Sequence, residues 1–201
     1  MRLYSMYTSL ETALATLRLP VLHMPDGGIG EDFLHVAGLV QVLTGNGTMR
    51  PFILLGIENI QRRRDLTGPT TGAEDRKVAP RVGGSAVFRQ FIREELMPQV
   101  KQHYRTNLET TIVGESLAGL FVVEIMLLGP NLFNTCLVFD PSQWWNNGQL
   151  AAQVGSLLRA AGRPLVTVYP VTSREGDLKA TSQLVDATGP RTGAWYNEPM
   201  P

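Results

Sequence analysis

The segment Thr111-Ile-Val-Gly-Glu-Ser-Leu-Ala-Gly-Leu120 decides the fold of this chain. It opens with β-branched and apolar residues, continues with a serine flanked by small residues, and leads into an apolar helical pattern from Leu117 to Leu128. We therefore predict a strand, a sharp turn and a helix, with Ser116 at the turn. This is the arrangement of a nucleophile elbow, in which a strained turn raises a serine hydroxyl above the edge of a sheet.

The residues around Ser116 follow the elbow pattern G-x-S-x-G with one departure. Gly114 stands where a larger side chain would strike the neighbouring helix or strand, as the pattern requires. Ala118 occupies the fifth position, with Gly119 after it, and alanine is the smallest step away from glycine. The same residues also fit a plain strand-to-helix turn in which the serine caps the helix, so the rest of the chain has to decide.

The composition is that of a soluble globular protein with one domain. Of 201 residues, 43% are apolar and 18% are charged, and 18 basic residues balance 18 acidic ones. This balance gives no indication of a nucleic-acid or membrane surface, and no apolar stretch reaches the roughly 18–20 residues of a membrane span. The lone Cys136 lies in an apolar run and is predicted to be a buried thiol. The N-terminus lacks an apolar signal core, which favours the cytoplasm but leaves the periplasm or secretion open.

Strands and helices alternate along the sequence. The patterns predict strands at residues 21–24, 52–57, 110–116, 136–140, 165–171 and 194–197, and helices at 31–43, 86–104, 117–128, 149–161 and 178–187. Residues 4–19 could form a strand and then a short helix. This alternation predicts an α/β fold with a mostly parallel sheet and helices on both faces.

Two segments depart from this regular alternation. Residues 58–84 are polar and too long for an ordinary connector, and loops of this length are often functional or mobile. Pro98 lies inside the long helical pattern of residues 86–104, where it is expected to kink the helix or split it in two.

Polar and aromatic residues follow the predicted strands. Parallel sheets place their sites at the carboxyl ends of the strands, so we expect these residues to lie around a pocket. They are Asp26-Gly27-Gly28, Asn59 with Arg62-Arg63-Arg64, Ser116, Asp140 with Trp144-Trp145, and Glu175 with Asp177.

The spaced motifs together resemble a known family. They are Pro20-Val-Leu-His-Met-Pro-Asp-Gly-Gly28, Asn59 with Arg62-Arg-Arg-Asp-Leu-Thr67, Gly83-Gly84, Phe91-Ile-Arg-Glu-Glu-Leu-Met-Pro98, Tyr104-Arg105, Gly114-Glu-Ser-Leu-Ala-Gly-Leu120 and Asp140-Pro-Ser-Gln-Trp-Trp-Asn146. In this order, over about residues 20–201, they resemble the esterase branch of the α/β hydrolases that includes enterochelin esterases and S-formylglutathione hydrolase relatives. The resemblance implies a single α/β-hydrolase domain over residues 1–201 that cleaves small carboxylic esters, siderophore-like or acyl and aryl, without a cofactor or metal ion.

The resemblance also implies roles at the centre of the site. Ser116 would attack the ester carbonyl after losing its proton to a base. The backbone N–H of Leu117 would be one donor of the oxyanion hole, and Gly27 or Gly28 in the turn after the first strand would supply the other. The alternative for that turn is a simple strand-to-helix connector.

Substrate-binding roles are predicted for the surrounding residues. Arg62 and Arg64 suit an anionic or catechol-like substrate, although Arg64 could instead pair with Asp65 and fix its loop. Trp144 and Trp145 could form an apolar wall or pack against the adjacent helix. Asp140 is a further binding candidate. For the acid of the triad, Glu175 is the first choice, with Asp177 and Asp140 behind it. The alternative for Glu175 is an exposed charge on a loop.

No histidine follows Ser116, although the family order is serine, acid and then histidine. His23 and His35 are expected to be packed, and His103 to lie on the surface. The final residues, 195–201, are similar to the family's strand before its histidine-bearing loop. We therefore expect the chain to be incomplete at its C-terminus, and the N-terminus could be incomplete as well. We also expect the chain to be nearly inactive as written, because loss of a triad member costs orders of magnitude in rate.

Two other functions remain open from the sequence. A non-catalytic relative that binds an ester or a protein partner would explain the missing histidine, whereas the elbow, the Asp-Gly-Gly turn and the tryptophan pair favour the enzyme. An acyltransferase would use the same acyl-enzyme with an alcohol as acceptor. The oligomeric state cannot be read from the sequence.

Overall fold

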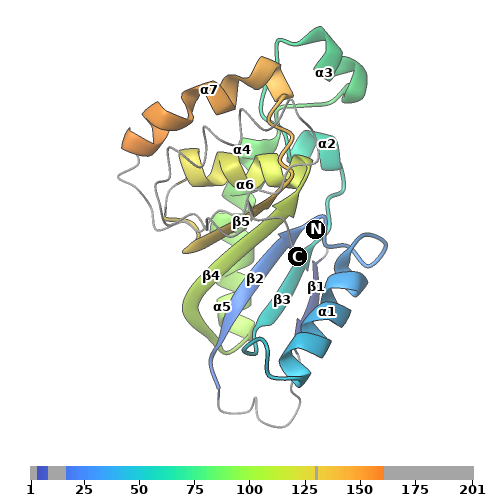
Figure 1. Ribbon diagram of the computed structural model, residues 1–201, viewed down its shortest axis with the longest axis vertical. Coiled ribbons are helices and arrows are strands. Elements are labelled where there is room, and N and C mark those ends of the chain that lie inside the picture. Colours follow the sequence, from blue (N-terminus) through green and yellow to red (C-terminus); the bar gives the residue numbers. More distant parts are fainter. Residues whose placement is uncertain (1–3, 9–16, 130, 161–201) are drawn as a thin grey trace, which may run out of the picture.

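The computed structural model describes residues 4–8, 17–129 and 131–160, which form a five-stranded sheet with helices on both faces (Figure 1). The strands are β1 (Tyr4–Thr8), β2 (Leu19–Pro25), β3 (Ile53–Ile57), β4 (Thr106–Glu115) and β5 (Thr135–Phe139), in the order β1-β3-β2-β4-β5. Only β1 runs antiparallel to its neighbour, β3, and the other pairs are parallel. The predicted mostly parallel α/β sheet is therefore confirmed.

Two hydrophobic clusters fill the two faces of the sheet. On one face, α1 (Phe33–Gly45) packs through Phe33, Ala37 and Val40 against Met24 and Leu54. On the other face lie α4 (Ser85–Phe91), α5 (Met97–His103) and α6 (Leu117–Leu128), visible behind the strands in Figure 1. Alternate strand residues supply each face, as the period of two requires. The predicted buried thiol Cys136 lies in the larger cluster, and burial raises its pKa to about 12.

The long helical pattern is divided into three segments, and the last of them begins directly before Pro98. A π-helical turn, η1 (Ile92–Leu96), joins α4 to α5 with ordinary helical backbone angles at the junctions. Pro98 lies in the first turn of α5, where the hydrogen bond that a proline cannot donate is not required. The π-helical turn before Pro98 is wider than an α-helical one, which relieves the clash of a proline ring with the preceding turn.

The polar segment 58–84 contains two short helices that the sequence analysis did not predict. They are α2 (Arg62–Asp65) and α3 (Ala73–Val78). The last described helix, α7 (Trp145–Ala160), begins with Asn146, Asn147 and Gly148 in the left-handed region, so its regular part starts near Gln149, as predicted. The strands and helix predicted beyond residue 164, and the helix predicted before Leu19, lie outside the described residues. No described helix has the length and apolarity needed to cross a bilayer.

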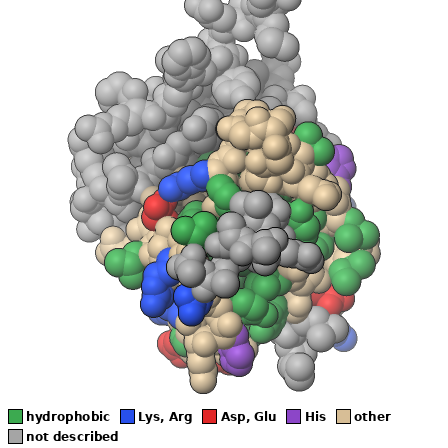
Figure 2. All heavy atoms as spheres, turned by 90° about the horizontal axis from the view of Figure 1, so that it is seen from below, with side chains coloured by type: hydrophobic (Ala, Val, Ile, Leu, Met, Phe, Trp, Pro, Cys, Tyr) green, Lys and Arg blue, Asp and Glu red, His purple; other side chains and the backbone are tan. Residues whose placement is uncertain are grey.

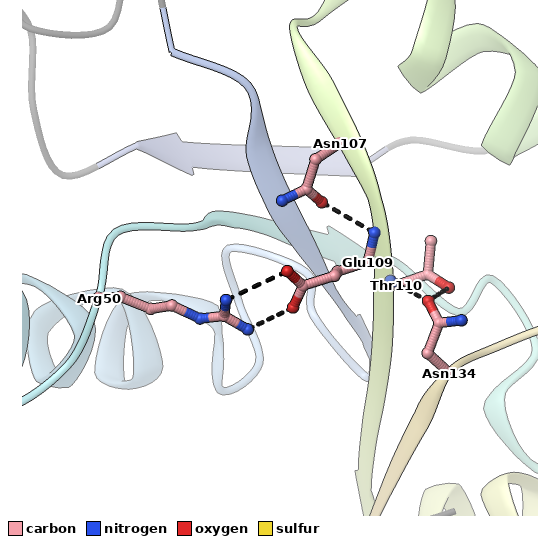
Figure 3. Close-up of polar contacts among 5 residues, drawn as sticks. All are labelled: Arg50, Asn107, Glu109, Thr110 and Asn134. Atoms are coloured by element: carbon pink, nitrogen blue, oxygen red, sulfur yellow. Dashed lines mark hydrogen bonds and ion pairs between the residues drawn. The ribbon is translucent and has the colours of Figure 1, made fainter. Parts of the chain in front are cut away.

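The end of the sheet where the parallel strands begin is held by exposed polar contacts (Figure 3). Arg50 reaches across β2 to form a two-pronged ion pair with Glu109, and these hydrogen bonds lower the pKa of Glu109. The Thr110 N–H and hydroxyl donate to Asn134 at 2.8 and 3.1 Å. Seen from this end, basic and acidic side chains of the described residues are interspersed with apolar ones (Figure 2).

His23 is a buried, uncharged histidine in β2. Its side chain is 1% exposed, Nδ1 donates to the Thr111 carbonyl at 3.1 Å, and the ring meets Phe133 edge-on at 5.0 Å. The prediction that His23 is packed is confirmed. Burial lowers its pKa from 6.5 to about 4, because a charged imidazolium there would lose its hydration.

This shift predicts an acid-sensitive fold. The unfolded His23 takes up a proton below pH 6.5 while the folded one stays neutral until about pH 4, so stability present above pH 6.5 is lost as the pH falls through this window. Within this window, His23 changes the free energy of unfolding by up to about 1.4 kcal/mol per pH unit. In urea unfolding at several pH values, the free energy of unfolding of His23→Gln should depend less on pH than that of the wild type.

The exposed His103 provides the matched control, since its ring lies at the surface end of α5. His103→Gln should leave the slope unchanged. Equal slopes for His23→Gln and the wild type would contradict the assignment of this pH dependence to His23.

Candidate active site

Ser116 lies at the sharp turn between β4 and α6 in a strained backbone conformation. Its φ of 57° and ψ of −118° place a non-glycine residue in a sparsely populated region, at a cost of order 1–3 kcal/mol. Its side chain makes no capping hydrogen bond to α6. The interpretation of Ser116 as a simple helix cap is therefore wrong, and the backbone has the form of a nucleophile elbow.

Close backbone packing explains the small residues around Ser116. A Cβ on Gly114 would lie 2.5 Å from the carbonyl carbon and oxygen of Ala118, so only glycine fits there. A Cβ on Gly119 would lie 2.9 Å from the Phe139 carbonyl oxygen. Helix α6 thus comes closest to β5 at Gly119. Ala118, in the fifth position of the pattern, is buried with 1% exposure.

The last residue of β5 and the loop that follows it bond the two backbone groups of Ser116. The Ser116 N–H donates to the Phe139 carbonyl at 3.1 Å, and the Ser142 N–H donates to the Ser116 carbonyl at 3.0 Å. The hydroxyl oxygens of the two serines lie 3.3 Å apart. The strained turn is therefore fixed by the end of the adjacent strand and the loop after it.

The turn after β2 is tied to the segment after β3 by Asp26. Its backbone is left-handed, with φ 60°, a conformation that aspartate tolerates better than most residues. One carboxylate oxygen accepts from Asn59 Nδ2 at 2.6 Å, and the other accepts from Arg62 Nε at 2.7 Å. Asp26 therefore fixes the position of Arg62 beside the strand ends.

The two glycines after Asp26 differ in their hydrogen bonding. The Gly27 N–H donates to the Ile57 carbonyl at 3.1 Å, and a Cβ on Gly27 would come within 2.4 Å of the Gly56 Cα. Gly27 is thus a packing residue between β2 and β3. The Gly28 N–H donates to the Glu31 carboxylate at 2.7 Å, and burial raises the pKa of that carboxyl. Of these two N–H groups, only that of Gly28 donates to a carboxylate.

A cavity of about 640 Å³ opens beside Ser116. Apolar side chains of β2, β4, β5 and α1 line most of it. Its polar lining includes Asp26, Asp32, His35, Arg62, Glu115 and Ser116. The cavity extends from the strand ends along the face of the sheet that α1 covers. Ser116, Arg62 and a set of apolar side chains therefore all face this cavity.

The other predicted binding residues lie outside the cavity lining. Arg64 donates twice to Asp65, at 2.9 and 2.7 Å, which is the loop-fixing alternative considered for it. Trp145 is buried, with its Nε1 donating to the Gly68 carbonyl at 3.1 Å, whereas Trp144 is 39% exposed. Asp140 is half-buried with a left-handed backbone, φ 38°. The acid candidates Glu175 and Asp177 are outside the described residues.

Of the three histidines, only His35 faces the cavity. The prediction that His35 is packed is wrong: its side chain is exposed and lines the cavity from α1. His103 is exposed at the end of α5, as predicted. Within the described ranges, no group of three or more His, Cys, Asp or Glu side chains is arranged to hold a metal ion.

The contacts of Ser142, Asp26 and Glu31 were not predicted from the sequence. Ser142 lies in the quoted Asp140–Asn146 motif, but no spacing signal links it to Ser116. The Gly28-x-x-Glu31 spacing did carry a signal, because a glutamate three residues after a turn start commonly bonds back to its N–H.

A strained serine between a central strand and a helix of a mostly parallel sheet defines the α/β-hydrolase class. Solved structures agree: a BES protein from Bacillus cereus matches with a TM-score of 0.73 at 23% identity, covering 89% of this chain and 75% of that one. The family model described as "Putative esterase" matches residues 12–191. The chain belongs to that family.

Two curated relatives match parts of the chain. The ferri-bacillibactin esterase BesA of Bacillus subtilis is 37% identical over 91 residues, which is 42% of this chain and 32% of that protein. An iron(III) salmochelin esterase of Escherichia coli is 26% identical over 129 residues, which is 63% of this chain and 29% of the relative. The matches thus span about a third of each relative's length.

The Asp26 contacts predict a measurable loss when they are removed. Asp26→Ala leaves Asn59 and Arg62 without their acceptor, and we expect it to lower the free energy of unfolding by about 1–3 kcal/mol. Asp26→Asn keeps the shape and tolerates the left-handed backbone, so it should lose less. Urea denaturation measures both.

Glu109→Ala is the matched control, because it breaks an ion pair with Arg50 whose side chains are 67% and 52% exposed. Its effect should be smaller than that of Asp26→Ala. A larger effect at Glu109 would show that Asp26 does not hold the strand ends together.

Proposed function

We propose that this protein is a serine hydrolase that cleaves carboxylic esters through an acyl-enzyme on Ser116. The observation that carries the proposal is the strained backbone of Ser116, φ 57° and ψ −118°, beside a cavity of about 640 Å³. A protein maintains such strain where surrounding contacts enforce it, and these positions cluster at active sites. Family membership supports the same chemistry.

The oxyanion formed in the first step needs two preorganised donors. Leu117 is the first residue of α6, and its N–H follows the nucleophile as the elbow geometry requires. We assign the second donor to Gly28 rather than Gly27, because the Gly27 N–H already donates to Ile57. The Glu31 carboxylate bound to the Gly28 N–H stands where a substrate oxyanion would bind, and the substrate would displace it.

We propose Glu175 as the acid of the triad. By the family order the base would be a histidine that follows the acid, and the three histidines of this sequence all precede Ser116. His35 is the one described histidine that faces the cavity. It lies on α1 rather than on a loop after a late strand, which is where the family order would place the base. The test of the proposal therefore includes His35.

The substrate class follows from the cavity and from the relatives. Apolar residues of the sheet and α1 suit an acyl or aryl group, and the Arg62 guanidinium offers hydrogen-bond donors beside it. Asp26 binds Nε of Arg62 and leaves its terminal nitrogens without a partner among the described residues. Because the curated relatives are named as esterases of ferri-bacillibactin and iron(III) salmochelin, we propose siderophore-type or small aryl esters as substrates.

Ester hydrolysis by the full-length protein tests the proposal. Ser116→Ala should lower kcat/KM for an aryl ester on the order of a thousandfold or more, because it removes the hydroxyl on which the proposed acyl-enzyme forms. His35→Gln should retain most of the activity. Release of the carboxylic acid, followed together with release of the alcohol, distinguishes hydrolysis from acyl transfer.

Unchanged hydrolysis by Ser116→Ala would exclude Ser116 as the nucleophile. Loss of activity in His35→Gln equal to that in Ser116→Ala would instead assign the base to His35. Wild-type protein without hydrolytic activity on any of these esters would favour a binding protein.

A further inference from the structure

The Ser142 side chain is buried next to the proposed nucleophile. It is 5% exposed, and its hydroxyl oxygen lies 3.3 Å from the Ser116 hydroxyl oxygen. Among the described residues this is the one hydrogen-bond partner of the Ser142 hydroxyl. Buried hydroxyls are nearly always bonded, so the position of Ser142 depends on Ser116.

The backbone around Ser142 leaves its side chain little freedom to move. Its N–H donates to the Ser116 carbonyl at 3.0 Å, and its carbonyl accepts from the Trp145 N–H at 3.2 Å. The preceding Pro141 has a fixed φ, and the Gln143 N–H donates to its carbonyl at 2.7 Å. The hydroxyl of Ser142 is therefore presented to Ser116 by a braced turn.

This turn is anchored to a distant segment of the chain. Trp145 is buried, and its Nε1 donates to the Gly68 carbonyl at 3.1 Å. The Asn146 N–H donates to the Asp75 carboxylate at 2.8 Å. Because these bonds join the turn to the segment that carries α3, the position of Ser142 is set by contacts that do not involve the substrate.

We propose that the Ser142 hydroxyl donates a hydrogen bond to Ser116 Oγ and stabilises the negative charge that develops on that oxygen during the reaction. This inference rests on the proposed function of Ser116. A hydroxyl pair at 3.3 Å is long for a hydrogen bond between two neutral groups. It would shorten as Oγ becomes charged, so the bond is stronger in the transition state than in the resting enzyme.

The chemistry balances without a further reactant. In acylation the Ser116 proton passes to the base, the Oγ–carbon bond forms, and the ester alkoxide leaves with that proton. In deacylation water gives a proton to the base as its oxygen adds to the acyl carbon, the Oγ–carbon bond breaks, and Ser116 Oγ takes that proton back from the base. Oγ carries partial negative charge in both steps, and Ser142 keeps its own proton throughout.

Steady-state hydrolysis of an aryl ester by the full chain tests this role. Ser142→Ala should lower kcat by about 10- to 100-fold, because it removes a hydrogen bond to a charged group in the transition state. KM should change by less than about threefold. Ser142→Thr restores the hydroxyl and should recover most of kcat, and Ser142→Cys, a weaker donor, should fall between them. Phosphonylation of Ser116 by a fluorophosphonate should slow by a factor similar to that for kcat.

Three outcomes would overturn the inference. The first is a kcat of Ser142→Ala within about twofold of the wild type while Ser116→Ala abolishes activity. The second is an equal loss in Ser142→Ala, Ser142→Thr and Ser142→Cys with unchanged unfolding midpoints, which would indicate packing. The third is a loss confined to KM. Failure of the proposed function is distinguishable, because Ser116→Ala would then keep its activity.

Discussion

The strained backbone of Ser116 is the constraint on which the site depends. With a φ of 57° and a ψ of −118°, Ser116 turns the chain sharply between the end of β4 and the start of α6. The strain persists because Phe139 and Ser142 bond both backbone groups of Ser116, and because Gly114 and Gly119 allow the helix and the neighbouring strand to approach. Removing any one of these contacts would let the turn relax toward an ordinary connector.

The other strand ends are held by a separate set of contacts that converge on the same space. Asp26 fixes Arg62 after β3, and Glu31 closes the turn after β2 on the Gly28 N–H. The cavity between α1 and the sheet brings Arg62 and Ser116 to one wall. The Ser116 hydroxyl and the Arg62 guanidinium therefore line one pocket, and contacts within the protein position both of them.

Strands β2 to β5 and the elbow could be predicted from the sequence, because buried apolar runs and the G-x-S pattern are local signals. His35 was misplaced, although the stripe of Phe33, Val36, Ala37 and Val40 on α1 already excluded it from the packed face. The pairing of Ser142 with Ser116 could not be predicted, because it depends on how two separate strand ends meet. The burial of Trp145 rather than Trp144 could not be predicted either, because it goes with a hydrogen bond from Trp145 Nε1 to the distant Gly68 carbonyl.

The most direct measurement of the central claim is the site of covalent labelling by a fluorophosphonate. The full-length protein would be incubated with the reagent, weighed intact and digested, and the modified peptide sequenced by mass spectrometry. We predict a single adduct on Ser116, since this residue lies at the elbow and lines the cavity. An adduct on another residue, or an unmodified protein under conditions that label a known serine esterase, would contradict it.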